Sequence, residues 1–127
     1  MNTFELAKQL ITSHRYQILD EDSSSGYLAF RFQINTIHFW TNEDDEHYFT
    51  MTLPNFTEVT EENIAQVKEK CHEINKECKM VKLYVLNDVI LAATELYYLA
   101  EEDFNFQMKN ALKHLVIAKV MYKKLEE

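Results

Sequence analysis

The stretch that decides the fold is residues 79–97, which read KMVKLYVLNDVILAATELY. A turn at Asn87-Asp88 folds this stretch into an antiparallel hairpin, with Leu86 opposite Val89 and Tyr84 opposite Leu91. One face of the hairpin then carries Val81, Leu83, Val85, Ile90, Ala92 and Leu96. The other face carries Met80, Tyr84, Leu86, Val89, Leu91 and Ala93, interrupted only by Lys82 and Glu95. A hairpin cannot leave both faces in water, so a helix of the chain, a second copy or a partner protein must cover the second one.

Three further strands are predicted upstream of this hairpin. A two-residue connection at Asn35-Thr36 would place Phe32 opposite Phe39, so that the apolar residues of the first two strands share one face. These alternating residues are Leu28, Phe30, Phe32 and Ile34, then Ile37 and Phe39. An acidic loop at 42–46 leads to a third strand, ended by Pro54, whose inward residues are Phe49, Met51 and Leu53.

Three stretches have the apolar spacing of amphipathic helices. The first covers residues 3–14, with Asn2 and Glu5 as a variant of the capping box. The second follows Thr60 as N-cap and carries a stripe of Ile64, Val67, Cys71, Ile74 and Cys78. The third has acidic residues from Glu101 onward at its start and lysines at its end, which suits the helix dipole. We therefore predict one α+β domain over residues 1–127, of order αβββαββα, with an antiparallel sheet packed against helices.

Charge and composition limit the classes of partner. The net charge is -8, and residues 1–62 hold three basic residues against eleven acidic ones. This negative field repels phosphate groups, so we predict no nucleic-acid and no membrane partner, and we favour basic partners. The sequence shows no secretion signal and no apolar run long enough to span a bilayer. Cys71 and Cys78 lie two helical turns apart, beyond disulfide reach, so we predict buried, reduced thiols and a cytoplasmic location.

The residues with chemical potential do not form a catalytic or metal-binding pattern. Cys71, His72 and Cys78 lack the spacing of a zinc site, and the acidic loop lacks the glycine and the bidentate glutamate of a calcium loop. The sequence also lacks a nucleophile motif of the Gly-x-Ser-x-Gly type. We therefore predict no enzymatic activity, no metal and no cofactor.

Two surfaces are candidates for contact with other proteins. The outer face of the upstream strands is rich in residue types that dominate interfaces, and we predict that a client protein docks on Tyr27, Arg31, His38, Trp40 and Tyr48. In the expected register Arg31 lies over Trp40 as a cation–π pair, although the same residues could simply stabilise a solvated sheet face. The second apolar face of the hairpin predicts a homodimer interface formed by Met80, Tyr84, Leu86, Val89 and Leu91.

The chain resembles the YbjN-type family of bacterial sensory transduction regulators in its order of elements and in the segment HEINK at 72–76, which runs through KMVKLYV at 79–85. The fold of that family is similar to that of type III secretion chaperones. The resemblance implies a homodimer without catalysis or cofactor that holds a segment of a client protein. We expect a non-catalytic protein-binding module, chaperone-like or regulatory. The alternatives are a structural subunit of a permanent complex and a small-ligand sensor with a pocket between sheet and helices.

Overall fold

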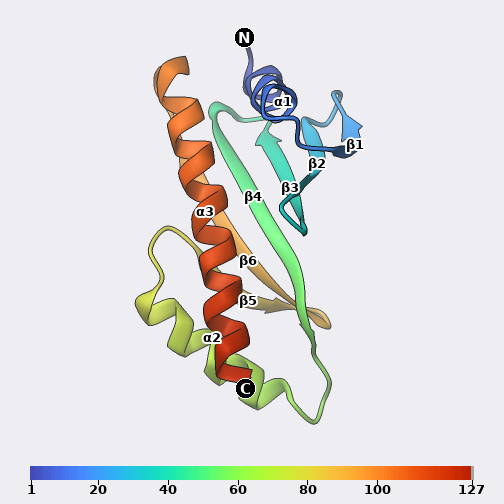
Figure 1. Ribbon diagram of the computed structural model, residues 1–127, viewed down its shortest axis with the longest axis vertical. Helices are drawn as coiled ribbons and strands as arrows, with labels where there is room; N and C mark the ends of the chain where they lie inside the picture. The colour runs from blue at the N-terminus through green and yellow to red at the C-terminus, as the bar shows by residue number, and fades with distance from the viewer. Residues whose placement is uncertain (127) are drawn as a thin grey trace.

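The computed structural model describes residues 1–126, except for the side chains of Asn55 and Phe56 (Figure 1). Within this range the helices are α1 (Thr3–Ser13), α2 (Ile64–Glu77) and α3 (Glu101–Glu126). The strands are β1 (Ile18–Asp22), β2 (Tyr27–Phe32), β3 (Asn35–Asn42), β4 (Asp45–Glu58), β5 (Lys82–Leu86) and β6 (Val89–Tyr97). They form one antiparallel sheet in the spatial order β1-β2-β3-β4-β6-β5.

The helices pack on one side of the sheet, and the core lies between the two layers (Figure 1). The inward side chains of β2, β3 and β4, among them Phe30, Phe39 and Phe49, are fully buried. Helix α3 contributes Phe104, Met108, Leu115 and Tyr122 to the same core. The α+β class predicted from the sequence is confirmed, and the inward set Phe49, Met51 and Leu53 is buried as expected.

Strand β1 was not predicted, because residues 15–25 carry no alternating apolar pattern. Asp20, Glu21 and Asp22 pair with Ala29, Leu28 and Tyr27 at the edge of the sheet. Four of the five residues of β1 are exposed, so the pairing with β2 rather than burial defines the strand. A charged edge strand of this kind discourages pairing with other chains. The chain reaches β2 through Gly26, whose φ of +70° and close approach to Thr41 leave no room for a Cβ.

The register of the first hairpin differs from the prediction by four residues. Phe32 pairs with Asn35 and Phe30 with Ile37, so the turn lies at Gln33-Ile34 instead of Asn35-Thr36. Gln33 has a φ of 59°, and Ile34, expected to point inward, is 87% exposed at the tip of the turn. Trp40 therefore lies opposite Tyr27, Arg31 lies opposite Thr36, and the predicted Arg31–Trp40 pairing is wrong.

The second hairpin has the predicted register. Leu86 pairs with Val89, Val85 with Ile90 and Tyr84 with Leu91 around the turn at Asn87-Asp88. Its inner face is buried at Val81, Leu83, Ile90 and Ala92, under α2 and α3. The hairpin joins the upstream strands through β6, which pairs along β4 from Tyr48↔Tyr97 to Pro54↔Leu91. Strand β4 thus continues beyond Pro54, where the prediction ended it.

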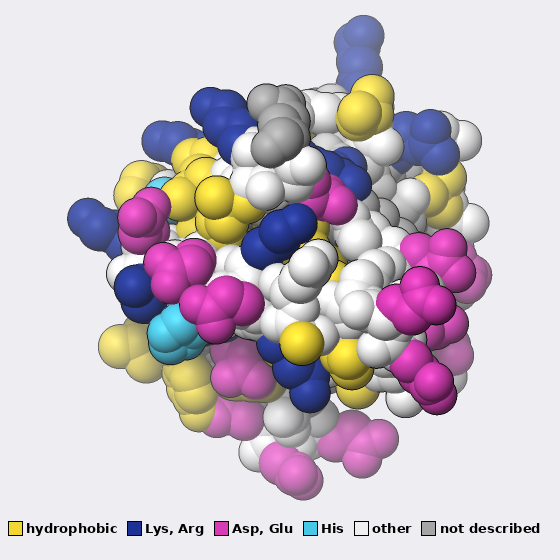
Figure 2. Space-filling view, turned by 90° about the horizontal axis from the view of Figure 1, so that it is seen from below, with side chains coloured by type: hydrophobic (Ala, Val, Ile, Leu, Met, Phe, Trp, Pro, Cys, Tyr) yellow, Lys and Arg dark blue, Asp and Glu magenta, His cyan; other side chains and the backbone are white. Residues whose placement is uncertain are grey.

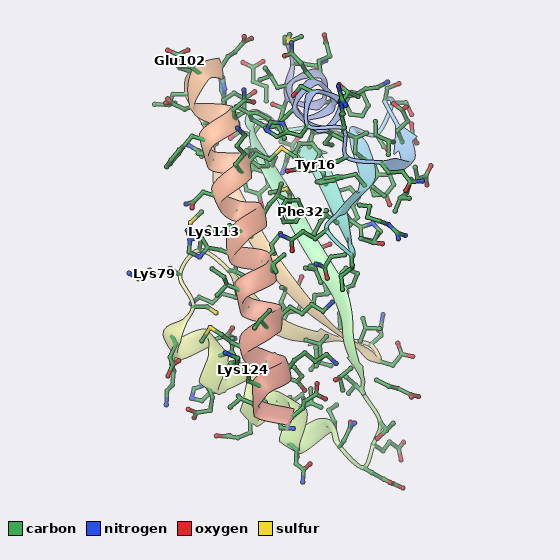
Figure 3. The ribbon with its side chains drawn as sticks, in the orientation of Figure 1. Tyr16, Phe32, Lys79, Glu102, Lys113 and Lys124 are labelled. Carbon is green, nitrogen blue, oxygen red and sulfur yellow. The ribbon has the colours of Figure 1, made fainter. Side chains whose placement is uncertain are left out.

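The helices begin and end close to the predicted positions. Asn2 caps α1 by accepting a hydrogen bond from the Glu5 amide at 2.8 Å. Helix α2 begins at Ile64 rather than directly after Thr60, whose hydroxyl instead accepts from the Asn63 amide within the preceding turn. Cys71 is buried as predicted, whereas Cys78 follows the end of α2, is half-buried and has its Sγ 3.8 Å from Sδ of Met121. At the other end of the core, Tyr16 packs edge-on against Phe32 (Figure 3).

Candidate partner-binding surface

The side of the sheet opposite the helices is uncovered by any element within residues 1–126, and we call it the open face. Since β4 pairs with β6, the outward side chains of both hairpins lie on this one face. Thr50 lies opposite Glu95, Thr52 opposite Ala93, and Pro54 opposite Leu91. The client surface and the dimer surface, predicted as separate features, are therefore neighbouring parts of a single surface.

A groove of about 700 Å³ crosses the open face. Its lining comes from the turn before β2 and from the described parts of β2, β3, β4, β6 and β5, and consists of Ser25, Tyr27, His38, Trp40, Thr50, Thr52, Pro54, Tyr84, Leu86 and Leu91. Tyr27, His38 and Trp40 belong to the predicted client surface, and Tyr84, Leu86 and Leu91 to the predicted dimer surface. The groove thus unites the central residues of both predictions.

The sheet register explains why this surface is hollow. One row across the strands carries the large side chains Tyr27 and Trp40. Another row, four residues further along β4 and β6, carries Pro54, Leu91 and Tyr84. The row between them contains Ala29, His38, Thr52 and Ala93 and ends at Lys82 of β5; Ala29, Thr52 and Ala93 are small. We call this middle row the floor and the two outer rows the walls. Alternate rows lie about 7 Å apart, so the walls are separated by about 13 Å.

An aromatic cluster forms the end of the groove at β2 and β3, where the Tyr27 and Trp40 wall meets His38 of the floor. Tyr27 Oη lies 2.8 Å from Nδ1 of His38, and the two rings stack with their centroids 5.9 Å apart. Trp40 lies 5.4 Å from Tyr27 and 5.7 Å from His38 between ring centroids. Burial lowers the pKa of His38, while burial and the nearby charge of Asp20 raise the pKa of Tyr27. Trp40 is nevertheless 39% exposed, so the cluster presents an aromatic surface to solvent.

Not every predicted site residue contributes to the groove. Tyr48 lies on the open face beyond the Trp40 wall and contacts Tyr97 at 6.0 Å between ring centroids. Arg31 is exposed near the first turn and is absent from the described lining. Met80 precedes β5, and its Sδ lies 3.3 Å from Nδ2 of Asn110 on α3. Figure 3 places its neighbour Lys79 beside α3, so the assignment of Met80 to the open face is wrong.

The charged side chains around the groove are mostly acidic. Asp20 and Asp22 flank its β1 side, Glu95 adjoins Thr50, and Glu58 pairs with Val89 near Leu86. Lys82 begins β5, but its ammonium donates to the carbonyls of Asn75 at 2.8 Å and Cys78 at 3.0 Å. The C-terminal end of α2 therefore engages this cation. Basic and acidic side chains are more evenly mixed at the end of the molecule near the C-terminus (Figure 2).

At Leu83, the backbone edge of the sheet at β5 is closed by a side chain. Asn75 of α2 donates from Nδ2 to the Leu83 carbonyl at 2.8 Å and accepts from the Leu83 amide at Oδ1 at 2.7 Å. The amide side chain thus occupies both backbone groups that an added strand would use at this residue. The sequence offered Asn75 only as part of a family-like segment, and its spacing of eight residues from Leu83 could not reveal this contact.

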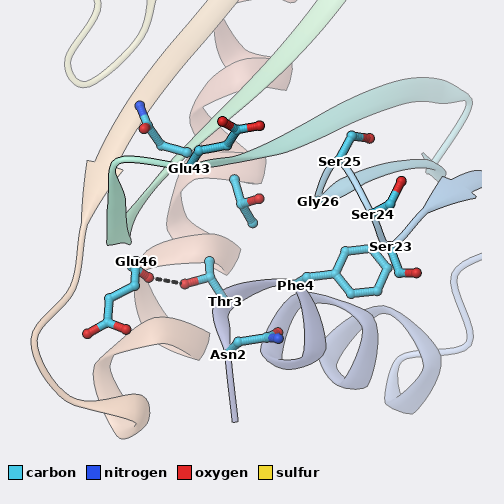
Figure 4. A pocket seen from close by; sticks show the side chains of 11 residues that line it. Asn2, Thr3, Phe4, Ser23, Ser24, Ser25, Gly26, Glu43 and Glu46 are labelled. Atoms are coloured by element: carbon cyan, nitrogen blue, oxygen red, sulfur yellow. Dashed lines mark hydrogen bonds between the residues drawn. The ribbon is translucent and has the colours of Figure 1, made fainter.

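A second, smaller cavity of about 200 Å³ lies at the start of α1 (Figure 4). Polar residues line it, including Asn2, Ser24 and Glu43. Thr3 closes one side through hydrogen bonds to the Glu46 carbonyl and to the Tyr98 hydroxyl. Among the described residues, no group of three His, Cys, Asp or Glu side chains is placed to hold a metal ion. Nor does any helix in residues 1–126 combine the length and apolarity required to cross a membrane.

The α+β fold of this chain is similar to the fold of a YbjN protein and of a type III secretion chaperone. The chain is similar to YbjN from E. coli, a candidate transcription regulator, with a TM-score of 0.71 and 9% identity over 99% of this chain and 97% of that one. It is also similar to the Yersinia pestis type III secretion chaperone SycH, crystallised with a stable fragment of YscM2, with a TM-score of 0.64 and 13% identity over 94% of this chain and 99% of that one.

An uncharacterised protein from Methanothermobacter thermautotrophicus is also similar, with a TM-score of 0.56 and 12% identity over 94% of this chain and 96% of that one. No family model and no curated protein sequence matches the chain. The predicted fold resemblance is confirmed, and it is a likeness of fold at very low sequence identity.

Proposed function

We propose that this protein is a non-catalytic protein-binding module, chaperone-like or regulatory, that receives a client or regulatory partner on its open face. The observation that carries the proposal is the apolar groove on a sheet face that no described element covers. Trp40, Tyr84 and Leu86 are 39%, 44% and 49% exposed, and contiguous exposed apolar side chains mark interaction surfaces. The SycH structure, which contains a bound protein fragment, supports a partner-binding role for a fold of this kind.

The groove favours a protein partner over a small ligand. It is a surface feature lined by side chains of several strands rather than a chamber between the sheet and the helices, where the sequence-based alternative placed a ligand pocket. Small-molecule sites bury most of the ligand surface, which an open groove does not do. The two free cysteines agree with the cytoplasmic setting expected from the sequence.

The homodimer expected from the sequence stays a prediction. Tyr84, Leu86 and Leu91 of the predicted interface line the groove, and Val89 pairs with Leu86 beside it. A dimer built on these residues would close the surface that the proposal assigns to the partner. Sedimentation at tens of micromolar, with and without the partner, separates the two uses of this surface.

The test compares the wild-type chain with a Trp40→Ala, Tyr84→Ala double variant in affinity capture from an extract of the native host. The proposal expects at least one protein that the wild type retains and the variant loses. A matched control is Phe106→Ala, because Phe106 is 72% exposed on α3, away from the open face. If no retained protein distinguishes the double variant from the wild type, the open face is not the partner surface. Native mass spectrometry of the purified chain would reveal the alternative, a retained small molecule.

A further inference from the structure

We infer that the groove binds a short, extended and basic segment of a partner protein, which lies across the strands rather than adding to them. This inference rests on the proposed function and specifies the partner's chemistry. It follows from three features of the described residues: the row structure of the open face, the charges around it and the closed edge at β5.

The row structure sets the direction and length of the bound segment. The small floor residues Thr52 and Ala93 lie opposite each other, so the channel between the walls runs across the strands. The lining extends from β2 to β5, which are four strand spacings apart in the described sheet. Four spacings of about 4.8 Å give about 19 Å, the length of about six residues of extended chain. The segment is held by side-chain contacts, because the backbone groups of interior strands are already paired.

Along the channel, the end at β2 and β3 differs in chemistry from the end at β6 and β5. At one end, Trp40 and Tyr27 offer aromatic faces that bind both apolar groups and cations. At the other end, Tyr84, Leu86 and Leu91 form an aliphatic and aromatic surface. A segment with an apolar side chain near each terminus satisfies both ends. A lysine or arginine beside the Trp40 end would also lie near Asp20, whose charge acts on Tyr27.

The charges around the groove favour a basic segment over an acidic one. The four acidic residues Asp20, Asp22, Glu95 and Glu58 surround it, against the cations Arg31 and Lys82, and the Lys82 ammonium is directed toward the carbonyls of Asn75 and Cys78 at the sheet edge. Arg31 is the exposed cation of β2 on this face. An acidic segment would meet more like charges than opposite ones around the groove, which costs affinity and slows association.

A second copy of the chain fits this surface less well. An interface between two copies related by a twofold axis brings the same patch of each subunit together. The patch here is hollow at its centre, so two copies facing each other would leave the floor residues Thr52 and Ala93 unfilled. The same acidic side chains would also approach one another.

The test uses a displayed library of random octapeptides selected on the 127-residue chain. Selected peptides are then synthesised and titrated against the chain, with Trp40, its single tryptophan, as the fluorescent reporter of the groove. We expect peptides that combine lysine or arginine with aromatic or aliphatic residues, and binding that shields Trp40 from a soluble quencher. Affinity should fall as salt rises, because acidic side chains surround the site.

Two variants test the location, and both keep the reporter. Ala93→Phe fills the floor at a half-buried position and should weaken binding by at least about tenfold. Glu95→Gln should weaken it by roughly threefold and reduce the salt dependence, whereas Glu69→Gln on the exposed side of α2 should change neither. Tyr84→Ala serves in place of Ala93→Phe if circular dichroism shows that the larger side chain disturbs the fold.

The outcomes separate this inference from the proposed function. Three outcomes would overturn the inference: no peptides are selected, the selected peptides are acidic, or binding survives both Ala93→Phe and Tyr84→Ala. Sedimentation that finds a dimer with Trp40 already shielded would assign the groove to a second copy. If a captured partner binds elsewhere on the open face and ignores Ala93→Phe, the inference fails while the proposed function stands.

Discussion

Replacement of Asn75 by alanine should destabilise the protein more than its place near the end of α2 suggests. Its side chain forms two hydrogen bonds with one residue of the neighbouring strand, donating to the Leu83 carbonyl and accepting from the Leu83 amide. Asn75→Ala removes both partners at once. The Leu83 side chain is only 2% exposed, so water has limited access to the backbone groups left behind.

The expected loss is about 2 kcal/mol in the free energy of unfolding. A typical intramolecular hydrogen bond contributes roughly 0.5–1.5 kcal/mol net, and a buried group left without a partner costs about 1–3 kcal/mol. Urea unfolding followed by circular dichroism measures this difference. The matched control is Lys76→Ala, one position further along α2, where the exposed ion pair with Glu73 contributes about 0.5 kcal/mol or less.

The Asn75→Asp variant tests the hydrogen-bond pattern itself. A carboxylate still accepts from the Leu83 amide, but it cannot donate to the Leu83 carbonyl and instead places a negative oxygen beside it. A protonated carboxyl group regains the donor, so the fold raises the pKa of this introduced group above its unfolded value. The deficit relative to the wild type should therefore shrink as the pH falls toward about 4.

Two results would show that Asn75 does not close the edge of β5 in solution. One is a loss of stability in Asn75→Ala no larger than that in Lys76→Ala, and the other is a deficit of Asn75→Asp that grows as the pH falls. In that case the β5 edge would be open to strand addition, as an alternative to binding on the open face.

Further predictions concern the open face and the thiols. Trp40→Ala should change the free energy of unfolding by less than about 1 kcal/mol, because the side chain is 39% exposed. The same variant should no longer retain the partner that the wild type captures. A large loss of stability in chemical denaturation would instead mark Trp40 as a structural residue. Burial lowers the pKa of His38, so the unfolded chain takes up a proton at a higher pH than the folded chain does. The contribution of His38 to the free energy of unfolding should therefore be complete above about pH 6.5 and be lost as the pH falls through the lowered pKa. Urea titrations should show a smaller decline for His38→Gln. Cys71→Ser should cost about 1–3 kcal/mol because Cys71 is 4% exposed. Burial raises the pKa of both thiols, and half-buried Cys78 should react with a thiol reagent faster than buried Cys71. Mass spectrometry measures the two labelling rates, and equal rates would contradict the positions of the two side chains.

The sequence was sufficient where strong local patterns met a well-defined turn. The hairpin at Asn87-Asp88 has the predicted pairing throughout, because Asn87 adopts a φ of 56° that suits a tight turn and the apolar alternation on both sides agrees with it. Helix α3 begins at Glu101 as its acidic first turn indicates. In both cases residues close in sequence determine the structure.

The first hairpin shows why alternation alone does not fix a register. A shift by an even number of residues leaves every side chain on the same face, so the predicted and observed pairings bury nearly the same residues. The choice between them depends on the turn, where Gln33 accepts a positive φ and Ile34 remains in solvent. An apolar residue at an exposed turn is unusual, and for that reason the sequence pointed to Asn35-Thr36 instead.

The groove depended on a contact between residues far apart in the sequence. Each hairpin could be derived separately, but whether β4 pairs with β6, and in which register, has no local signal. That pairing sets Thr52 beside Ala93 and places the Trp40 wall about 13 Å from the Leu91 wall. A shift of two residues would place a large side chain of β6 on the floor and fill the channel. The pairing that creates the groove also makes the two predicted interfaces exclusive, because a partner lying between the walls contacts Trp40 and Tyr84 together and leaves neither available to a second copy.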